Sequence, residues 1–377
     1  MKILITGGAG FIGSKLAQRM ISRGNQVILL DNLSPQIHGP DASFPSTLAV
    51  EAHCVKGDVG DTDTLHRAAA DVEAIVHLAA ETGTGQSMYE VERYSRTNIQ
   101  GTAVLLDMLV NRRPRHLTKL VVASSRAIYG EGQYGCGTCG VVYPKPRSAS
   151  AMSAGRFEAE CPKCGSGITV QPTGEDAPMS PSSFYGLSKQ VQEQMVLMFS
   201  STLGMDAVAL RYQNVYGPGQ SLRNSYTGLL AVFSNLVRQG KPLDVFEDGL
   251  ESRDFVYIED VIEATAACLE PEVHGIHALN VGSGTRTSVK NVAHAVRHFF
   301  RSAVPIRVTG QFRLGDIRHN VADISRIRAL TGFEPKWTFE AGLDRFLDWA
   351  MQSDACEAGF EQSLREMRER GLFRGAD

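Results

Sequence analysis

The feature that most constrains the fold is a glycine-rich turn at the start of the chain. An apolar stretch runs into Gly7, Gly10 and Gly13, after which apolar residues return every three or four positions. Glycine permits a tight turn, close approach of a phosphate to the backbone, and close packing of helix on strand. An ordinary strand-to-helix turn is the alternative. Because the turn follows the first strand, we expect a dinucleotide site of the Rossmann type, built from Gly7, Gly10, Phe11, Ile12 and Gly13.

Short apolar segments alternate with helix-like segments through the first half of the chain. Alternation of this kind predicts βαβ units and a parallel sheet that is covered on both faces. The expected fold class is therefore α/β, a Rossmann-type doubly wound parallel sheet. The expected strands are 3–6, 26–31, 74–78, 119–125 and 207–211, and the expected helices are 12–23, 62–70 and 98–111.

The ends of the later strands supply the rest of the dinucleotide site. Asp31 ends the second strand, where a carboxylate can bind the adenosine ribose and repel a 2′-phosphate, which favours NAD over NADP. His77 is interpreted as a strand residue and not as a ligand. The residues expected around the cofactor after the second, third and fourth strands are Asp31, Asn32, Asp58, Val59, Leu78, Ala79 and Ala80.

Two Cys-x-x-Cys pairs indicate a metal site. Cys136 and Cys139 are separated by 21 residues from Cys161 and Cys164, a spacing typical of two zinc knuckles that share one ion. Four thiolates fill the tetrahedral shell of zinc, so the predicted ion is structural. A redox-active dithiol or accidental pairs are the alternatives.

Changes in composition divide the chain. A segment rich in Gly, Pro, Ser and Cys interrupts the pattern after residue 130, and regular alternation ends near Val215. We expect an NAD-binding Rossmann domain at 1–130, 176–214 and 250–285, a zinc-ribbon insertion at 131–175, and a smaller C-terminal substrate-binding lobe at 215–249 and 286–377.

Overall charge and hydropathy exclude several partners. With 38 basic and 41 acidic residues the net charge is −3, so no basic field would attract nucleic acid or a membrane surface. No apolar run reaches the roughly 20 residues that span a bilayer. The chain also begins without the pattern of a signal peptide. We therefore expect a cytoplasmic protein without nucleic-acid or membrane partners.

A tyrosine, a lysine and a serine form the predicted reaction site. Tyr185 and Lys189 are four residues apart, on one face of a helix, and Ser125 ends a strand at the sheet edge where ligands bind. A phenol with a pKa of about 10 is a poor base at neutral pH. A nearby lysine and a positive nicotinamide would favour its phenolate, and a serine could orient a substrate hydroxyl.

These motifs together resemble the extended short-chain dehydrogenase/reductases, the branch with NDP-sugar epimerases, dehydratases and decarboxylases. The matching segments are GGAGFIG from Gly7, HLAA from His77, SSRAIYG from Ser124, YGLSK from Tyr185, RYQNVYGPGQ from Arg211, RDFVYIEDV from Arg253 and GDIRH from Gly315. The resemblance implies that Ser125, Tyr185 and Lys189 are catalytic and that Asn98, Tyr185 and Lys189 contact NAD. It also implies that Asn214, Arg253 and Arg318 surround the substrate nucleotide and diphosphate, although a salt bridge is the alternative for both arginines.

Within this family, the residues after Ser125 indicate the reaction. Dehydratases and decarboxylases carry acids there, whereas this chain has Arg126-Ala127. We therefore expect 4-epimerisation, in which the sugar is oxidised to a 4-keto intermediate and reduced again on the opposite face. Arg126 could contact a substrate carboxylate or phosphate, or turn away from the site. A 4,6-dehydratase, a decarboxylase, a net sugar dehydrogenase and a non-catalytic NAD sensor are the alternatives.

Three further segments narrow the resemblance. GQSMYE from Gly85, the cysteine insertion and FRLGDIRH from Phe312 resemble the bacterial dTDP-L-rhamnose 4-epimerases. This implies a dTDP- or UDP-hexose substrate, with Gln86 and Ser87 near the sugar. A homodimer is also implied by the family. The apolar spacing of Val191, Met195, Val196 and Phe199 fits a dimer, and fits packing within one subunit equally well.

Overall fold

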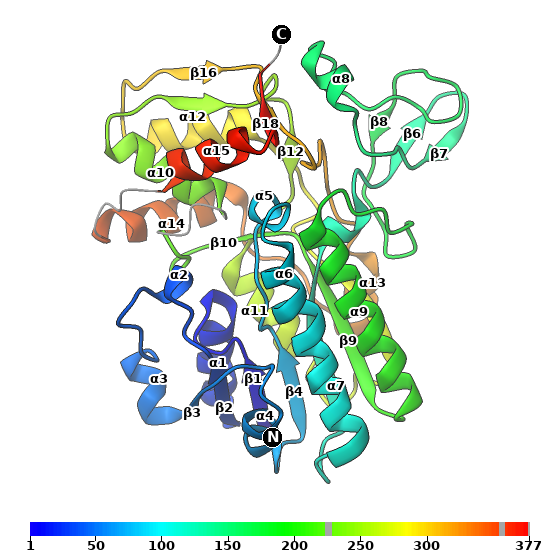
Figure 1. The fold of residues 1–377 in the computed structure, drawn as a ribbon, viewed down its shortest axis with the longest axis vertical. Coiled ribbons are helices and arrows are strands. Elements are labelled where there is room, and N and C mark those ends of the chain that lie inside the picture. The colour runs from blue at the N-terminus through cyan, green and yellow to red at the C-terminus, as the bar shows by residue number, and fades with distance from the viewer. Residues whose placement is uncertain (223–227, 354–358, 376–377) are drawn as a thin grey trace.

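The computed structural model describes residues 1–222, 228–353 and 359–375. Seven parallel strands form its central sheet, in the order β14-β9-β5-β4-β1-β2-β3 (Figure 1). The chain winds outward in both directions from the β1/β4 pair, which confirms the predicted doubly wound fold. The strands are β1 (Lys2–Thr6), β2 (Gln26–Asp31), β3 (His53–Lys56), β4 (Ala74–His77), β5 (Lys119–Ser125), β9 (Asp206–Tyr212) and β14 (Ile276–Val281).

Helices cover both faces of the sheet because strand residues alternate between two cores. In β1, Ile3 and Ile5 pack with Leu16 and Met20, whereas Leu4 belongs to the core on the other face. One face is covered by α1 (Phe11–Ser22) and α11 (Ile258–Ala267). The other is covered by α4 (Thr62–Ala69), α7 (Gly101–Arg112) and α9 (Phe184–Thr202).

The observed elements agree closely with the expected ones, and β3 is the third strand that the sequence implies before Asp58 without giving its bounds. Two differences remain. A π-helix at Ser95–Gln100 precedes α7, so the helix expected from residue 98 begins inside a continuous helical segment. No strand is expected at β14, because His277 and Asn280 interrupt its apolar pattern. Asn280 is nevertheless fully buried, and its amide donates to the carbonyl oxygens of Thr173 and Asp323.

A smaller lobe lies beyond the carboxyl ends of the strands, at the top of Figure 1. Residues 223–227, 354–358 and 376–377 of the expected substrate-binding lobe, with Cys356 among them, lie outside the described residues. The lobe contains α10 (Leu229–Arg238), β11 (Leu243–Val245), α12 (Val289–Phe299), β16 (Ile306–Val308), β17 (Phe312–Arg313), α14 (Phe339–Gln352), α15 (Phe360–Glu369) and β18 (Phe373–Arg374).

Shorter elements lie between the strands and helices named above. The strand pairs are β10 (Asn214–Tyr216) with β13 (Phe255–Tyr257), and β12 (Ser252–Arg253) with β15 (Thr287–Ser288). The short helices are α2 (Pro35–His38), α3 (Ser46–Glu51), α5 (Thr84–Ser87), α6 (Val91–Tyr94), the 3-10 helix η2 (Arg126–Tyr129) and α13 (Ser325–Thr331).

The cysteine-rich segment forms a small sheet of its own, beside the lobe in Figure 1. The strands β6 (Tyr134–Cys136), β7 (Gly140–Val142) and β8 (Thr169–Val170) pair antiparallel, and α8 (Ala149–Ser153) follows β7. Its buried cluster contains only Tyr134, Cys136, Val142, Ala159 and Cys161. So small a core leaves the cysteines at the centre of this segment's packing.

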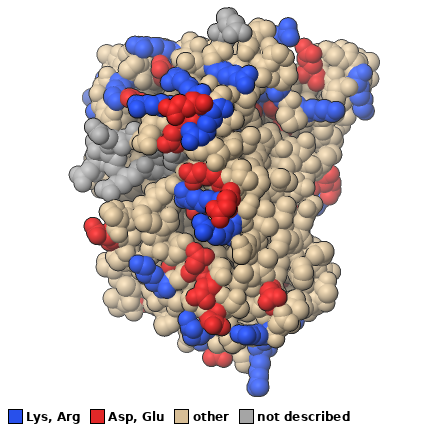
Figure 2. Space-filling model, in the orientation of Figure 1, with Lys and Arg blue, Asp and Glu red and all other residues tan. Residues whose placement is uncertain are grey.

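The apolar spacing on α9 is explained within one subunit. Val196 is fully buried, and Met195 and Phe199 pack against the same core. The homodimer therefore stays a prediction. Within the described ranges, no helix is long and apolar enough to cross a membrane. Figure 2 shows basic and acidic side chains interspersed on this face of the molecule.

Candidate active site

A cavity of about 560 Å³ runs from the glycine turn along the carboxyl edge of the sheet to the smaller lobe. Asp31 enters its wall from β2, and Ser125 enters from β5. The cavity therefore lies at the carboxyl edge of the sheet, where the sequence analysis predicts the site. Of the residues expected around the cofactor, those in the wall are Gly7, Gly10, Phe11, Ile12, Gly13, Asp31, Asn32, Asp58, Val59, Leu78, Ala79, Ala80, Tyr185 and Lys189.

The glycine turn requires glycine for steric reasons. Gly7 has a φ of +68°, and a Cβ atom on Gly13 would lie 2.2 Å from the Gly7 carbonyl oxygen. Gly10 is the N-cap of α1, and no side chain caps this helix. The amides of its first turn therefore face the cavity without a side-chain acceptor, as a phosphate-binding helix start requires.

The Asp31 carboxylate is fixed by the backbone around it. Its oxygens accept hydrogen bonds from the N–H of Ala9 at 3.0 Å and of Leu33 at 2.8 Å. At the next strand end, the Asn32 amide donates to Asp58 at 2.9 Å. Both carboxylates retain lone pairs that can accept further hydrogen bonds from hydroxyl or amino groups in the cavity.

Asn98 does not lie in the described wall of the cavity, in contrast to the expectation. It is fully buried, and its amide donates to Ser188 at 2.9 Å and to the Glu81 carbonyl at 3.1 Å. Its side chain therefore ties the loop after β4 to α9. His77 is buried in β4 between the hydroxyls of Thr6 and Thr102, as expected of a strand residue.

The proton-transfer residues meet where α9 begins. Ser125 is the last residue of β5, and Tyr185 lies in the first turn of α9. A Cβ atom on Gly186 would lie 2.5 Å from the Ala127 carbonyl oxygen, so only glycine lets the helix start approach η2 this closely. The structure thus brings Ser125, Tyr185 and Lys189 into one cavity wall.

The charge beside Tyr185 differs from the expectation. Burial raises the pKa of Tyr185, while a hydrogen bond from Ser125 and the Arg126 charge lower it. The Lys189 ammonium instead donates to the Ala123 carbonyl and the Gln192 amide oxygen, each at 2.7 Å. Burial lowers the pKa of Lys189 to about 7. Among the described side chains, Arg126 is the cation that lowers the pKa of Tyr185.

Three of the expected substrate residues lie in the cavity wall: Arg126, Asn214 and Arg253. The Nη1 atom of Arg126 is buried and has no hydrogen-bond partner in the protein. Burial and the repulsion of Arg253 lower the pKa of Arg126 to about 9, whereas Asp316 and Tyr185 oppose this shift. The Arg126 side chain thus faces the site and does not turn away. The Oδ1 atom of Asn214 is also buried and unpaired.

Gln86 and Ser87 do not line the cavity. Their neighbours Thr84 and Gly85 form this part of its wall. The Gln86 amide donates to Gln36 at 3.2 Å and to Glu90 at 3.1 Å. Both side chains are buried, so the structure does not support the expected direct sugar contacts.

The expected role of Arg318 needs correction. Arg318 is fully buried, and its guanidinium donates to Glu158, Glu247 and Asp248. Arg318 therefore forms a buried salt bridge, which is the alternative prediction to a diphosphate contact. Arg313, which sequence reasoning missed, does line the cavity and has a buried, unpaired Nε atom. Its position just before Gly315-Asp316 was the available signal.

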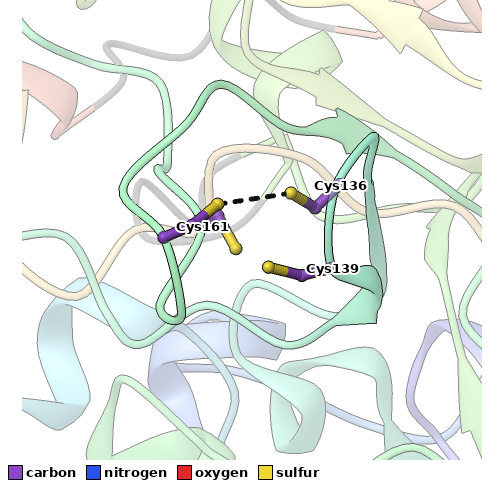
Figure 3. Close-up of side chains that lie close together, drawn as sticks. Cys136, Cys139 and Cys161 are labelled. Atoms are coloured by element: carbon purple, nitrogen blue, oxygen red, sulfur yellow. Dashed lines mark hydrogen bonds between the residues drawn. The ribbon is translucent and has the colours of Figure 1, made fainter.

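The four cysteine thiols of the insertion converge on one point. Figure 3 shows the sulfur atoms of Cys136, Cys139 and Cys161 directed toward one another. Together with Cys164, their sulfur atoms all lie within 4.8 Å of one another, and Cys136 and Cys164 are 3.6 Å apart. All four are free thiols, so the cluster could hold a metal ion.

The sequence pattern of the NAD dependent epimerase/dehydratase family matches residues 3–153 and 159–282. The chain belongs to this family. This confirms the predicted resemblance to the extended short-chain dehydrogenase/reductases. Among curated members, the chain is 39% identical to a dTDP-L-rhamnose 4-epimerase of Burkholderia thailandensis, over 93% of this chain and 95% of the relative. It is 28% identical to a putative UDP-glucose 4-epimerase of Methanocaldococcus jannaschii, over 92% and 97%.

Solved structures of the family agree in fold. The UDP-glucose 4-epimerase of Thermotoga maritima with UDP-glucose has a TM-score of 0.75 at 28% identity, covering 93% of this chain and 99% of its own. The UDP-glucose 4-epimerase of Thermus thermophilus in complex with NAD has a TM-score of 0.73 at 26% identity, covering 94% and 100%.

Proposed function

We propose that this protein is an NAD-dependent NDP-sugar 4-epimerase acting on dTDP-L-rhamnose or a related dTDP- or UDP-hexose. The observation that carries the proposal is the 39% identity to a dTDP-L-rhamnose 4-epimerase over 93% of the chain. The cavity supports it, because Tyr185 and Ser125 stand in its wall together with the glycine turn.

The cavity residues fit NAD. The uncapped start of α1 offers amides to the pyrophosphate, and Asp31 is oriented to accept from the adenosine ribose. Leu78, Ala79 and Ala80 leave room above the sheet. NAD, when bound, supplies a hydride acceptor that later returns the same hydride, so the cycle needs no external oxidant.

Tyr185 and Ser125 handle the proton in this proposal. The Tyr185 oxygen takes the proton of the sugar 4-hydroxyl as C4 is oxidised and returns it when C4 is reduced on the other face. Ser125, within hydrogen-bonding reach of Tyr185, orients the hydroxyl. Arg126 beside Tyr185 stabilises the phenolate that accepts this proton, and Tyr185 is the neutral phenol while the keto sugar rotates in the site.

Arg126 also separates this reaction from elimination. Dehydratases and decarboxylases of this family carry acidic residues directly after the serine that corresponds to Ser125, whereas this chain has Arg126 there. An arginine is always protonated near neutral pH and cannot act as the acid. Its unpaired Nη1 atom is free to donate to an oxygen of the sugar.

Two other arginines suit the diphosphate. Arg253 and Arg313 reach the cavity from the lobe side, and guanidinium groups pair with phosphate oxygens through two hydrogen bonds. Arg313 replaces Arg318 in this assignment, because the Arg318 guanidinium is already bound by carboxylates.

We further propose that Cys136, Cys139, Cys161 and Cys164 hold one structural zinc ion. Tetrahedral zinc–thiolate bonds of about 2.3 Å place the sulfur atoms about 3.8 Å apart. The 3.6 Å between Cys136 and Cys164 is close to this value. Four thiolates leave no open position for a substrate, so the role of the ion would be structural.

We also retain the homodimer as a proposal. Leu187 and Met198 on α9 and Val110 on α7 are exposed. Figure 2 shows few charged side chains over these helices. The molar mass of the purified protein, measured by light scattering, tests this proposal.

The proposed activity is tested by incubating the purified protein with a panel of dTDP- and UDP-sugars and following the products by NMR. We expect a product that differs from its substrate only in configuration at C4, with no net change in NAD. Release of water or carbon dioxide from the sugar would assign a dehydratase or a decarboxylase instead.

A further inference from the structure

Arg147 joins the cysteine insertion to the active-site cavity. Its side chain is only 4% exposed. Nε donates to Glu131 at 3.1 Å, Nη1 donates to Glu247 at 2.8 Å, and Nη2 donates to the Asp316 carbonyl at 3.0 Å. Nη1 also donates to the Phe157 carbonyl at 3.1 Å. One guanidinium thus makes hydrogen bonds to four separate residues.

The partners of Arg147 belong to three separate segments of the chain. Glu131 and Phe157 are in the cysteine insertion, and Glu247 follows β11 in the smaller lobe. Asp316 follows β17 and lines the cavity. Arg147 therefore connects the insertion with both the lobe and the cavity wall.

Apolar packing supports the same segment from the insertion side. Phe312 of β17 is fully buried and packs with Met152 and Phe157 of the insertion. Its neighbours Arg313 and Asp316 line the cavity. Residues 312–316 thus lie between the insertion and the cavity, and we call them the bridging loop.

Two buried carboxylates beside the bridging loop depend on the positive charge of Arg147. Glu131 and Glu247 are both buried, and an unpaired buried carboxylate is strongly unfavourable. Arg318 offers partial compensation, because its guanidinium binds Glu247 and its backbone N–H donates to Glu131 at 2.8 Å. Without Arg147, no other described cation pairs with the Glu131 side chain, and the Asp316 carbonyl loses this donor.

We propose that Arg147 is a positioning residue for the sugar nucleotide, which holds the bridging loop so that Arg313 and Asp316 face the cavity. The cysteine insertion is then a part of the substrate site and not a peripheral attachment. The identity of the ligand rests on the proposed function. None of the hydrogen bonds of Arg147 goes to Ser125 or Tyr185, so the proposal assigns Arg147 to substrate binding and not to proton transfer.

The test compares three variants of the full chain with the wild type. Arg147→Met removes the hydrogen bonds, and Arg147→Lys retains the charge but cannot bind all partners at once. Arg156→Met, an exposed arginine of the same insertion, is the matched control. The readouts are NAD content, melting temperature, kcat, KM, the Kd for dTDP and UDP, and hydrogen exchange of the bridging loop without nucleotide.

For Arg147→Met, we expect KM and the nucleotide Kd to rise about tenfold or more, with kcat within about threefold of wild type. NAD content should remain unchanged, and exchange of the bridging loop should increase. Arg147→Lys should show intermediate values, and Arg156→Met should match the wild type. A merely structural role would lower NAD content and the melting temperature together, without this split between KM and kcat.

Wild-type nucleotide affinity and wild-type exchange of the bridging loop in Arg147→Met would overturn the proposal. If that variant does not fold, the same two results in Arg147→Lys would overturn it. A wild-type protein that binds nucleotide but epimerises no sugar would refute the proposed function alone. A wild type that binds neither dTDP nor UDP would refute the ligand named here as well, while exchange would still report whether Arg147 holds the loop.

Discussion

The backbone N–H of Tyr185 donates a hydrogen bond to the hydroxyl oxygen of Ser87 over 2.9 Å. The Ser87 hydroxyl in turn donates to the Thr84 carbonyl at 2.7 Å. Ser87 therefore links the short helix α5, whose Thr84 lines the cavity, to the first turn of α9. The position of the reacting phenol depends on a side chain that lies behind the cavity wall.

Replacing Ser87 by Ala should lower kcat about fivefold, because loss of one hydrogen bond of about 1 kcal/mol lets the start of α9 shift. NAD content should not change. Steady-state kinetics measure the effect, with Ser201→Ala at the exposed end of α9 as the control. An unchanged kcat would show that Ser183, the N-cap of α9, positions Tyr185 without help from Ser87.

Replacing Tyr185 by Phe should lower turnover by about 10²-fold or more, because only the oxygen that transfers the proton is lost. Folding and NAD binding should be retained. Tyr143→Phe in the insertion removes an exposed phenol and serves as the control. Turnover within tenfold of wild type would remove Tyr185 from the proposed mechanism.

Replacing Asp31 by Ala should reduce the preference for NAD over NADP by about tenfold or more, because the carboxylate binds the ribose and repels a 2′-phosphate. Binding of both cofactors, measured by calorimetry, gives the preference directly. Asp41→Ala is the control, since Asp41 is exposed between α2 and α3. An unchanged ratio would assign the selection to another residue.

Glu251 should make nucleotide-sugar binding depend on pH. Burial raises the pKa of Glu251 to about 7, with Arg253 and Arg318 opposing and Glu247 adding to this shift. Below pH 7 the carboxyl group is neutral, and above pH 7 its charge repels a diphosphate in the same cavity. The Kd of a UDP- or dTDP-sugar should therefore rise about fivefold between pH 6 and 8.

The Glu251→Gln variant should lose this pH dependence and bind at pH 8 as the wild type binds at pH 6. A nucleotide sugar is the right probe, because its diphosphate diester does not titrate in this range. Glu272→Gln, on the exposed surface, provides the matched control. The same pH profile in Glu251→Gln and wild type would rule out Glu251 as the titrating group.

Purified protein should contain about one zinc ion per chain, measured by elemental analysis. Chelation, or replacement of Cys136 and Cys139 by Ser, should increase protease cleavage within 131–175 and should impair sugar-nucleotide turnover more than NAD binding. Cys54→Ser, outside the cluster, is the control. Metal-free protein prepared under reducing conditions, or a disulfide between these pairs, would contradict the zinc proposal.

The sheet and the cofactor half of the site could be predicted because their signals are local. A strand that is buried on both faces has a continuous apolar run in its sequence. The glycine turn is also local, because it joins one strand to the next helix. The strand β14 was not predicted because the polar Asn280 interrupts its apolar run. Its amide replaces apolar packing with hydrogen bonds to Thr173 and Asp323, which are distant in sequence.

The substrate half of the site was predicted less well because its residues are selected by tertiary contacts. Arg313 and Arg318 are both arginines beside the same Gly315-Asp316 turn, and sequence alone does not show which one meets buried carboxylates. The carboxylates around Arg318 come from the insertion and from the loop after β11. Likewise, the Ser87 hydroxyl accepts a hydrogen bond from the backbone N–H of Tyr185, a contact that its place in the sequence does not reveal.

The pairing of β14 with β9 has a consequence for synthesis on the ribosome. β9 ends at Tyr212, and its outer partner begins only at Ile276. At about 5–20 residues per second, the open edge of β9 waits several seconds for that strand. Of the smaller lobe, α10 and β11 lie between the two strands, so the nascent sheet carries an unpaired edge while this part of the lobe emerges. An exposed edge of this kind can pair with other chains, so the nascent protein is exposed to aggregation during this interval.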